Sequence, residues 1–290
     1  MLLSLQNITK TYKTNERVFL PSFSTFTDAR QDKAGFLKTL LMPSLNEICK
    51  VWKEAPGTKT HKMMNILMKE EESQVIAVRG VSLEFAEGDF AAIAGPSGSG
   101  KSTLLNIMGT LEEPTTGRMF FNGKDMYLAG EDEKAGFRLK TLGFIFQAFN
   151  LIPVLSAYEN VEYPLILKGL VGSERRSLVE EALRFVGLSD CMQRKPSKLS
   201  GGQQQRVAIA RAIAAGPKLI LADEPTANLD SKTAMEVVRL MERINKETGT
   251  TFIFSSHDDL ILSIAQRVIK LRDGKIIGGP RTPKHRDALK

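Results

Sequence analysis

Residues Gly95–Thr103 read GPSGSGKST, and this stretch decides the fold. A short apolar run, Phe90–Ala94, comes directly before it, and a helical pattern, Ser102–Met108, follows. Glycines let the backbone curl so that successive N–H groups point inward at an anion, and the start of a helix adds its positive dipole end. Strand, glycine-rich loop, lysine, hydroxyl and helix in this order predict a phosphate-binding loop that holds a nucleoside triphosphate. The residues that we expect to contact it are Gly95, Pro96, Ser97, Gly98, Ser99, Gly100, Lys101, Ser102 and Thr103.

Two groups of side chains have expected tasks at this loop. Lys101 is expected to reach the β- and γ-phosphates, and the Ser102 hydroxyl to bind Mg²⁺. A second part of the site comes from Leu219–Ala222, an apolar run followed by Asp223 and Glu224. By itself, an acidic pair after a strand is most often the start of a solvated loop. Next to a phosphate loop, Asp223 is expected to hold Mg²⁺ through water and Glu224 to polarise the water that attacks the γ-phosphorus, so the predicted chemistry is hydrolysis.

Length and composition are those of a soluble globular protein. The chain has 290 residues, enough for about two domains or one large domain with an insertion. Hydrophobic residues make up 42% and charged residues 25%, so wholesale disorder is not expected. Forty Lys and Arg against 33 Asp and Glu leave a net charge of +7. This charge would suit binding to nucleic acid or to an anionic membrane, but it is equally consistent with charge that only keeps the protein in solution. From Val75 onward, short apolar runs alternate with helical patterns, which predicts an α/β domain with a largely parallel sheet.

Cysteines and hydropathy bear on the compartment. The two cysteines, Cys49 and Cys191, form neither a metal-binding pattern nor a disulfide framework, which favours a reducing compartment. No run approaches about 18 consecutive apolar residues, and the amino terminus lacks the layout of a signal peptide. We therefore expect any work on a membrane to be done from the cytoplasmic side and through a partner.

A second glycine-rich turn, LSGGQ at Leu199–Gln203, enters a helical pattern at Gln204–Ala215. This pentapeptide, placed before the acidic strand, resembles the signature of the ABC ATPases, and the resemblance covers nearly the whole chain outside residues 13–74. It implies a Q-loop glutamine that contacts Mg²⁺ and the attacking water, then a D-loop, then a switch histidine that contacts the γ-phosphate. In this sequence these elements are Gln147, Ala227–Asp230 and His257.

The resemblance also implies which residues bind and react. The implied catalytic residues are Lys101, Gln147, Glu224 and His257. The implied metal-binding residues are Ser102, Gln147 and Asp223. Beyond the phosphate loop, the residues implied to contact ATP are Tyr12, Ser200, Gly201, Gly202, Gln203 and Asp230.

Tyr12 is similar to the family's aromatic A-loop residue, which stacks on adenine. In the family that residue lies a few tens of residues before the phosphate loop, whereas 82 residues separate Tyr12 from Gly95 here. An insertion in the hairpin after Tyr12 would account for the gap, because a long loop costs little closure entropy. Taken alone, Tyr12 would be an ordinary aromatic residue after a predicted strand at Leu2–Ile8.

The resemblance implies the fold class in more detail. It is an α/β fold: a P-loop ABC ATPase with a RecA-like core, an antiparallel β subdomain and a helical subdomain at about 148–205. We assign residues 1–12 and 75–290 to this ATPase domain, and residues 13–74 to an N-terminal insertion.

The insertion carries a candidate docking helix. Ser44–Glu47 fits a capping box, and the apolar residues that then share one helical face are Leu45, Ile48, Cys49 and Trp52. Ten Lys and Arg against eight Asp and Glu show that the segment is no polybasic anchor. We expect the apolar face to meet a membrane-embedded partner or the bilayer surface, while packing on the domain's own core is an equal alternative.

The sequence holds one phosphate loop and one signature turn, with no internal repeat of either. In the family these two lie on opposite faces, so a complete site combines the phosphate loop of one chain with Ser200 and Gly202 of another. The helix start at the signature then directs its dipole to the γ-phosphate only when two chains close around ATP. We expect a head-to-tail homodimer around two ATP.

Further runs narrow the resemblance to one branch. Residues Phe146–Pro153, Tyr158–Val161 and Thr251–Asp258 resemble the branch of lipoprotein-releasing and macrolide-efflux exporters. This implies a peripheral ATPase subunit on the cytoplasmic face of the inner membrane, which powers a separate transmembrane permease through its Q-loop and helical subdomain.

Two alternatives stay open. One is a nucleic-acid-associated ABC ATPase, although the chain has neither the long coiled coils nor the second cassette of such members, and we expect no nucleic acid partner. The other is a non-transport scaffold, against which the intact Lys101, Asp223, Glu224 and His257 argue.

Overall fold

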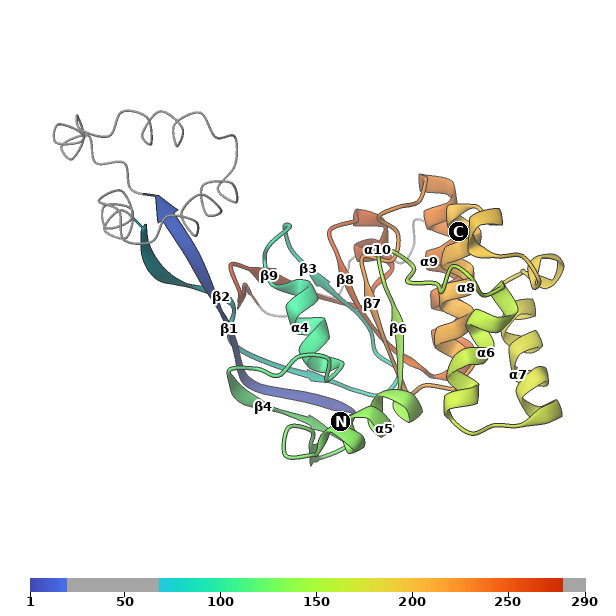
Figure 1. Cartoon of the computed structure of the whole chain (residues 1–290), viewed down its shortest axis with the longest axis horizontal. Coiled ribbons are helices and arrows are strands. Elements are labelled where there is room, and N and C mark those ends of the chain that lie inside the picture. Colours follow the sequence, from blue (N-terminus) through green and yellow to red (C-terminus); the bar gives the residue numbers. More distant parts are fainter. Residues whose placement is uncertain (20–67, 279–290) are drawn as a thin grey trace, which may run out of the picture. The chain divides into compact units, whose positions relative to one another are not determined.

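The computed structural model of the protein describes residues 1–19 and 68–278. The chain divides into two compact units, one of Met1–Thr11 with Ile76–Lys290 and one of Tyr12–Val75 (Figure 1). Strands β1 (Leu3–Phe19) and β2 (Met68–Phe85) each run from one unit into the other.

The strand predicted at Leu2–Ile8 is therefore too short, since β1 continues to Phe19. A register shift between Gln6 and Thr9, with Asn7 at φ 51°, interrupts the alternation of side chains where the sequence pattern ended. Both ends of the segment 13–74 are strand, and the capping box and apolar helical face predicted within it lie outside the described residues.

Within the described residues, six strands form one sheet in the order β10-β9-β3-β8-β7-β6. Strand β10 pairs antiparallel with β9, and the other neighbours pair in parallel. The bounds of the strands are β3 Phe90–Ala94, β6 Leu142–Ile145, β7 Leu219–Asp223, β8 Thr251–Ser256, β9 Arg267–Arg272 and β10 Lys275–Ile276. The predicted α/β fold with a largely parallel sheet is confirmed.

This sheet is buried on both faces, which explains the continuous apolar runs. In β3, Phe90 and Ala92 belong to one apolar core, whereas Ala91 and Ile93 belong to the other. The Phe90 ring packs against that of Phe254 from β8 with the centroids 4.6 Å apart. A buried strand thus delivers the glycine-rich loop to the end of a rigid sheet.

Helices cover the sheet, and α6, α7 and α8 pack on one another and share one apolar core with the sheet (Figure 1). The helix bounds are α4 Lys101–Met108, α5 Glu131–Thr141, α6 Ala157–Leu167, α7 Gly172–Phe185, α8 Gly201–Ile213, α9 Ser231–Thr248 and α10 Asp259–Ile264, with short 3₁₀ turns η3 Ser189–Cys191 and η4 Pro196–Lys198. The helix predicted at Gln204–Ala215 begins three residues earlier, at Gly201, because Ser200 and Gln203 cap it.

A second sheet has the order β2-β1-β4-β5, where β4 is Thr116–Phe121 and β5 is Lys124–Asp125. Strand β4 pairs antiparallel with both β1 and β5. Helix α4 shares one apolar core with this sheet and with β3, so the loop before α4 is held between two layers. In residues 1–19 and 68–278, no helix has the length and apolarity needed to span a membrane.

Candidate nucleotide-binding and hydrolysis site

The phosphate loop leaves β3 and ends at the start of α4. Its last glycine, Gly100, is the N-cap of α4 with φ 98°, and no side chain caps this helix. A Cβ atom on Gly100 would collide with the carbonyl oxygen of Ala77, so the position admits only glycine. A helix start with this loop geometry and without a side-chain cap presents backbone N–H groups to an anion.

The ammonium group of Lys101 lies inside the loop. Its side chain is 7% exposed, and its Nζ donates to the carbonyl oxygens of Gly95 at 2.8 Å and Pro96 at 3.1 Å. The same Nζ lies 3.4 Å from Oε1 of Glu224. A buried cation needs such oxygen partners, and they hold the charge at the mouth of the loop.

The acidic residues predicted after β7 lie directly beside the loop. Oδ1 of Asp223 accepts a hydrogen bond from Oγ of Ser102 at 3.0 Å and a second one from Oγ of Ser255. Ser255 pairs with Asp223 in the register of β7 and β8, and it was not singled out from the sequence. A serine at the end of a buried strand is the signal that could have found it, because a polar side chain there needs a partner.

Glu224 and His257 form a second contact at the same edge of the sheet. Oε1 of Glu224 lies 3.0 Å from Nδ1 of His257, and the Glu224 N–H donates to the carbonyl oxygen of Ser255 at 3.0 Å. The Glu224 side chain is 13% exposed and that of His257 68%. Glu224 has φ 45°, an uncommon conformation for a residue with a side chain, which fits a site where strain fixes geometry.

Gln147 and the predicted D-loop lie together. The side-chain amide of Asn228 donates to the backbone carbonyl of Gln147 at 2.9 Å. Asp230 caps α9, and its carboxylate accepts from the N–H of Thr233 at 3.0 Å and from its hydroxyl at 2.6 Å. These two donors lower the pKa of the Asp230 carboxyl below its ordinary value.

The signature turn forms the start of α8. The Ser200 hydroxyl accepts from the Gln203 N–H at 3.3 Å, and the Ser200 N–H donates to the Gln203 side chain at 3.0 Å. A Cβ on Gly202 would collide with the methyl group of Thr233, so the turn packs closely on the start of α9. Gly201 lies next to Asn228 and Leu229, which places the turn beside the D-loop.

Tyr12 belongs to the second unit, Tyr12–Val75, whereas the phosphate loop belongs to the first. Its predicted contact with adenine therefore stays a prediction.

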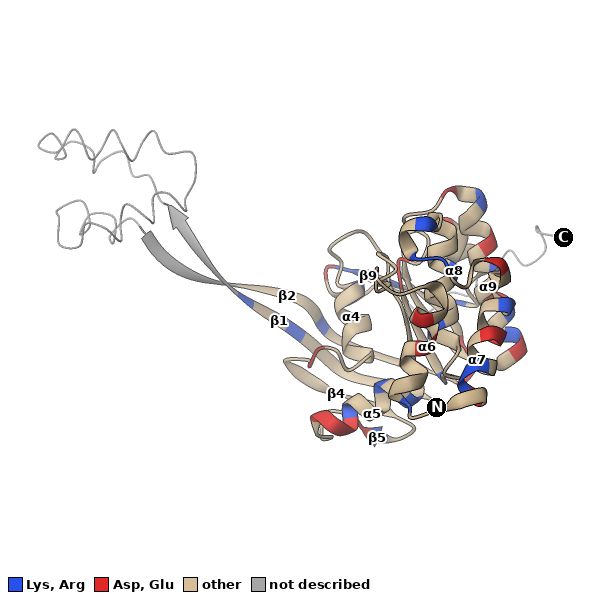
Figure 2. Ribbon diagram, turned by 45° about the vertical axis from the view of Figure 1, so that its right-hand side comes forward, with Lys and Arg blue, Asp and Glu red and all other residues tan. Residues whose placement is uncertain are grey.

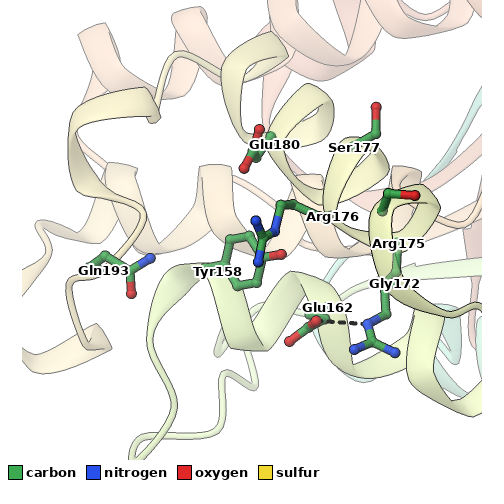
Figure 3. Close-up of a pocket in the computed structure, with 9 residues that line it drawn as sticks. Tyr158, Glu162, Gly172, Arg175, Arg176, Ser177, Glu180 and Gln193 are labelled. Atoms are coloured by element: carbon green, nitrogen blue, oxygen red, sulfur yellow. Dashed lines mark hydrogen bonds and ion pairs between the residues drawn. The ribbon is translucent and has the colours of Figure 1, made fainter.

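Two of the hollows that described residues line are found outside this edge of the sheet. One, of about 790 Å³, is lined by polar side chains of α6 and α7, and Figure 3 shows the pair Arg175–Glu162 at its side, with an N–O distance of 2.7 Å. The other, of about 410 Å³, is mainly apolar, and the residues that line it include Leu111, Leu139, Phe144, Phe146, Tyr163, Pro164 and Arg211. Phe146 directly precedes Gln147, so the apolar hollow adjoins the Q-loop.

The residues that meet at this edge of the sheet occur in a known protein family. A protein family described as ABC transporter matches residues 78–227, which include the phosphate loop, the signature turn and the acidic strand. The chain belongs to the ABC transporter family. It is an ATP-binding subunit of this family that binds ATP with Mg²⁺ and hydrolyses ATP, as the sequence predicted.

Two relatives of this ABC ATPase each cover about seven tenths of the chain. It is 50% identical over 211 residues to the ABC transporter ATP-binding protein YtrE of Bacillus subtilis, covering 73% of this chain and 91% of the relative. It is 45% identical over 206 residues to the lipoprotein-releasing system ATP-binding protein LolD of Geobacter metallireducens, covering 71% and 92%.

A solved structure shares the fold of this ABC ATPase. It is the ATP-binding cassette MJ0796 of Methanocaldococcus jannaschii, a dimer in a post-hydrolysis state bound to ADP and Pi. The TM-score is 0.73 at 35% sequence identity, with 98% of this chain and 100% of that chain covered.

Proposed function

We propose that this ABC ATPase works as a homodimer around two ATP and powers a separate membrane permease for lipoprotein release or export. The observation that carries the proposal is the meeting of Lys101, Ser102, Asp223, Glu224 and His257 at one edge of the parallel sheet. A cation, oxygen donors for a metal and a general base are together the groups that phosphoryl transfer to water requires.

The residues divide the chemistry among them. Lys101 neutralises charge on the β- and γ-phosphates, and its present partners are oxygens that phosphate oxygens can replace. Glu224 orients the attacking water and accepts a proton from it. His257, whose Nδ1 lies 3.0 Å from Oε1 of Glu224, would contact the γ-phosphate. Gln147 directly follows Phe146, which lines the apolar hollow, and its side chain would contact Mg²⁺ and the attacking water.

The metal donors fit Mg²⁺. Ser102 and Asp223 offer two oxygens that already lie 3.0 Å apart, and hard oxygen donors are what Mg²⁺ prefers. In the part of the chain that the structure describes, no group of three or more His, Cys, Asp or Glu is arranged so that it could hold a metal ion by itself, so phosphate oxygens and water would supply the remaining ligands. When bound, Mg²⁺ would neutralise charge that develops on the phosphates.

The second copy would complete the site with Ser200, Gly201, Gly202 and Gln203. Support comes from the capping box, which fixes Ser200 at a helix start, and from the dimeric state of the related cassette. Asp230, at the start of α9 beside the signature turn, would lie at the same boundary between copies.

The apolar hollow next to Gln147 supports a permease as the partner. Two of the apolar side chains that line it, Tyr163 of α6 and Leu111, are each 46% exposed. Apolar surface of this kind beside a Q-loop suits a helix of a membrane protein. The 45% identity with a lipoprotein-releasing ATP-binding protein supports the cargo class and a peripheral position on the cytoplasmic face of the membrane.

A nucleic-acid partner is the weaker candidate. Figure 2 shows blue and red residues mixed along α7 and α9, where a binding face for nucleic acid would be predominantly basic. Mixed charges of this kind indicate helix faces that are exposed to solvent.

Co-purification from detergent-solubilised membranes tests the proposal. We expect the chain to bring down an integral membrane protein with a large extracytoplasmic domain, and its ATP hydrolysis to change when that protein is present. Tyr163→Asp in the apolar hollow should weaken the complex while leaving hydrolysis by the isolated chain unchanged, and Arg176→Asp in the polar hollow is the matched control. Recovery of nucleic acid, or of neither partner, would reject the transporter role.

A further inference from the structure

We propose that Thr226 and Asp258 are positioning residues for hydrolysis, and that they hold Glu224 and His257 against each other. Neither was singled out from the sequence. The inference rests on the roles proposed above for Glu224 and His257. It concerns two segments, 223–226 and 255–258, which begin in the last residues of β7 and β8 and lie side by side.

The contact between the two residues is short, and its threonine side is shielded from water. Oγ1 of Thr226 donates to Oδ2 of Asp258 at 2.9 Å, and Thr226 is 4% exposed. The other oxygen of Asp258, Oδ1, accepts from the N–H of Leu260 at 2.9 Å and caps α10. Each carboxylate oxygen of Asp258 thus has a donor on a different segment, which fixes the carboxylate in place.

This hydrogen bond can position Glu224 and His257 because of where it lies along the two segments. The pairing of β7 with β8 ends at Asp223 and Ser255. The Thr226–Asp258 bond joins the same segments a few residues further on, and the Glu224–His257 contact lies between the two attachments. The Glu224–His257 contact is therefore held by an attachment on each side. A segment attached at one end only can open by fraying, whereas this one cannot.

Both reacting side chains need such support. His257 is 68% exposed, so solvent alone would leave its ring free to rotate. Glu224 holds φ 45°, a conformation that persists only when its surroundings impose it. Gln205 of α8 adds a further attachment, because its side chain donates to the carbonyl oxygen of Pro225 at 2.7 Å.

The residue types allow a matched test. Thr226→Val keeps the shape of the side chain and removes the hydroxyl, whereas Thr226→Ser keeps the hydroxyl. With Thr226→Val we expect kcat for ATP hydrolysis to fall about tenfold, the effect of one hydrogen bond that positions a reacting group, with KM for ATP within about twofold. Thr226→Ser should restore most of kcat.

A double-mutant cycle separates positioning from general stability. In a His257→Ala background, Thr226→Val should lower kcat by less than about twofold more, because the side chain that it positions is already gone. A full tenfold loss in that background, an unchanged kcat in Thr226→Val alone, or a loss confined to KM would each overturn the proposal. Thr226→Ser matching Thr226→Val would do so as well.

The cycle also distinguishes this inference from the proposed roles. If His257→Ala and Glu224→Gln both hydrolyse ATP at the normal rate, the roles assigned to these side chains are wrong and the positioning proposal is overturned with them. If both are impaired while Thr226→Val is normal, the roles stand and the positioning proposal alone is overturned.

Discussion

The two glycine-rich turns of this ABC ATPase both lead into helices, but the N-termini of the two helices are capped differently. At α4 the N-cap is Gly100, and no side chain caps the first turn. At α8 the N-cap is Ser200, and its hydroxyl and the Gln203 side chain form a complete capping box. A helix start without a side-chain cap suits phosphate as its ligand, whereas a capped start is stable by itself.

The difference indicates how the two turns use nucleotide. The phosphate loop surrounds the buried Lys101, so changes there should act on ATP binding within one chain. The signature turn is already formed and packed on α9, so changes there should spare binding and act on hydrolysis between two chains.

The largest effect is expected for Lys101→Met. Removing the cation from the phosphates should lower phosphate release about 1,000-fold and ATP affinity at least about tenfold. Phosphate release and titration with a fluorescent ATP analogue measure the two. Lys134→Met is the control, because Lys134 is equally buried but pairs with Glu113 and Glu131 away from the loop. Hydrolysis by Lys101→Met at more than about a tenth of the normal rate would contradict the assignment.

The second largest effect is expected for Gly100→Ala. The added methyl group meets the carbonyl oxygen of Ala77 and forces the loop away from φ 98°, so hydrolysis should fall about 100-fold. Gly216→Ala is the matched control, because φ is 61° there and the space beside it is open. That change should cost about 1 kcal/mol of folding free energy and leave hydrolysis normal. Equal loss of activity in both variants would show that strain, not the closeness of β2, limits the loop.

Ser200→Ala should have an intermediate effect of a different kind. Losing the cap should cost about 1 kcal/mol and lower hydrolysis about tenfold, while ATP affinity stays within about twofold. Isothermal titration with ATP, set beside steady-state hydrolysis, separates the two quantities. Ser200→Thr should retain the cap. A loss of affinity as large as the loss of rate would remove the contrast between the two turns.

The smallest effect is expected from pH at Asp230. Because Thr233 holds the pKa of this carboxyl below the ordinary value of 3.8, its contribution to stability is present above that value and is lost as the pH falls through the lower pKa of the folded state. Asp230→Asn should remove this dependence, so the melting temperatures of the two proteins should converge by about 2 °C on acidification from pH 6 to pH 2.5. Parallel melting curves over that range would show that the carboxylate does not stabilise α9.

Much of the site could be predicted because its signals are local. The glycines, Lys101 and Ser102 follow a buried strand in sequence, and Asp223 and Glu224 follow another. Parallel strands bring their carboxyl ends to one edge, so two local patterns are enough to predict one site. The helix at Lys101–Met108 and the strand at Leu219–Asp223 accordingly lie within a residue of their predicted bounds.

The missed residues depend on contacts that sequence spacing does not reveal. Ser255 bonds to Asp223, and Asp258 bonds to Thr226, although the partners in each pair lie about 30 positions apart in the sequence. The alignment of β7 with β8 is what brings them together. The full length of β1 was missed for a related reason, since the shift between Gln6 and Thr9 breaks the alternation on which strand prediction depends.

If ATP is clamped between two copies of this chain, the mass of Glu224→Gln in solution should depend on the nucleotide. This change keeps the shape of the side chain and removes the proposed base, so ATP should bind and persist. With MgATP, sedimentation should give twice the single-chain mass of 32.1 kDa, and with ADP, or with Lys101→Met added, it should give one chain. A protein that binds MgATP tightly yet sediments as a single chain would contradict the account.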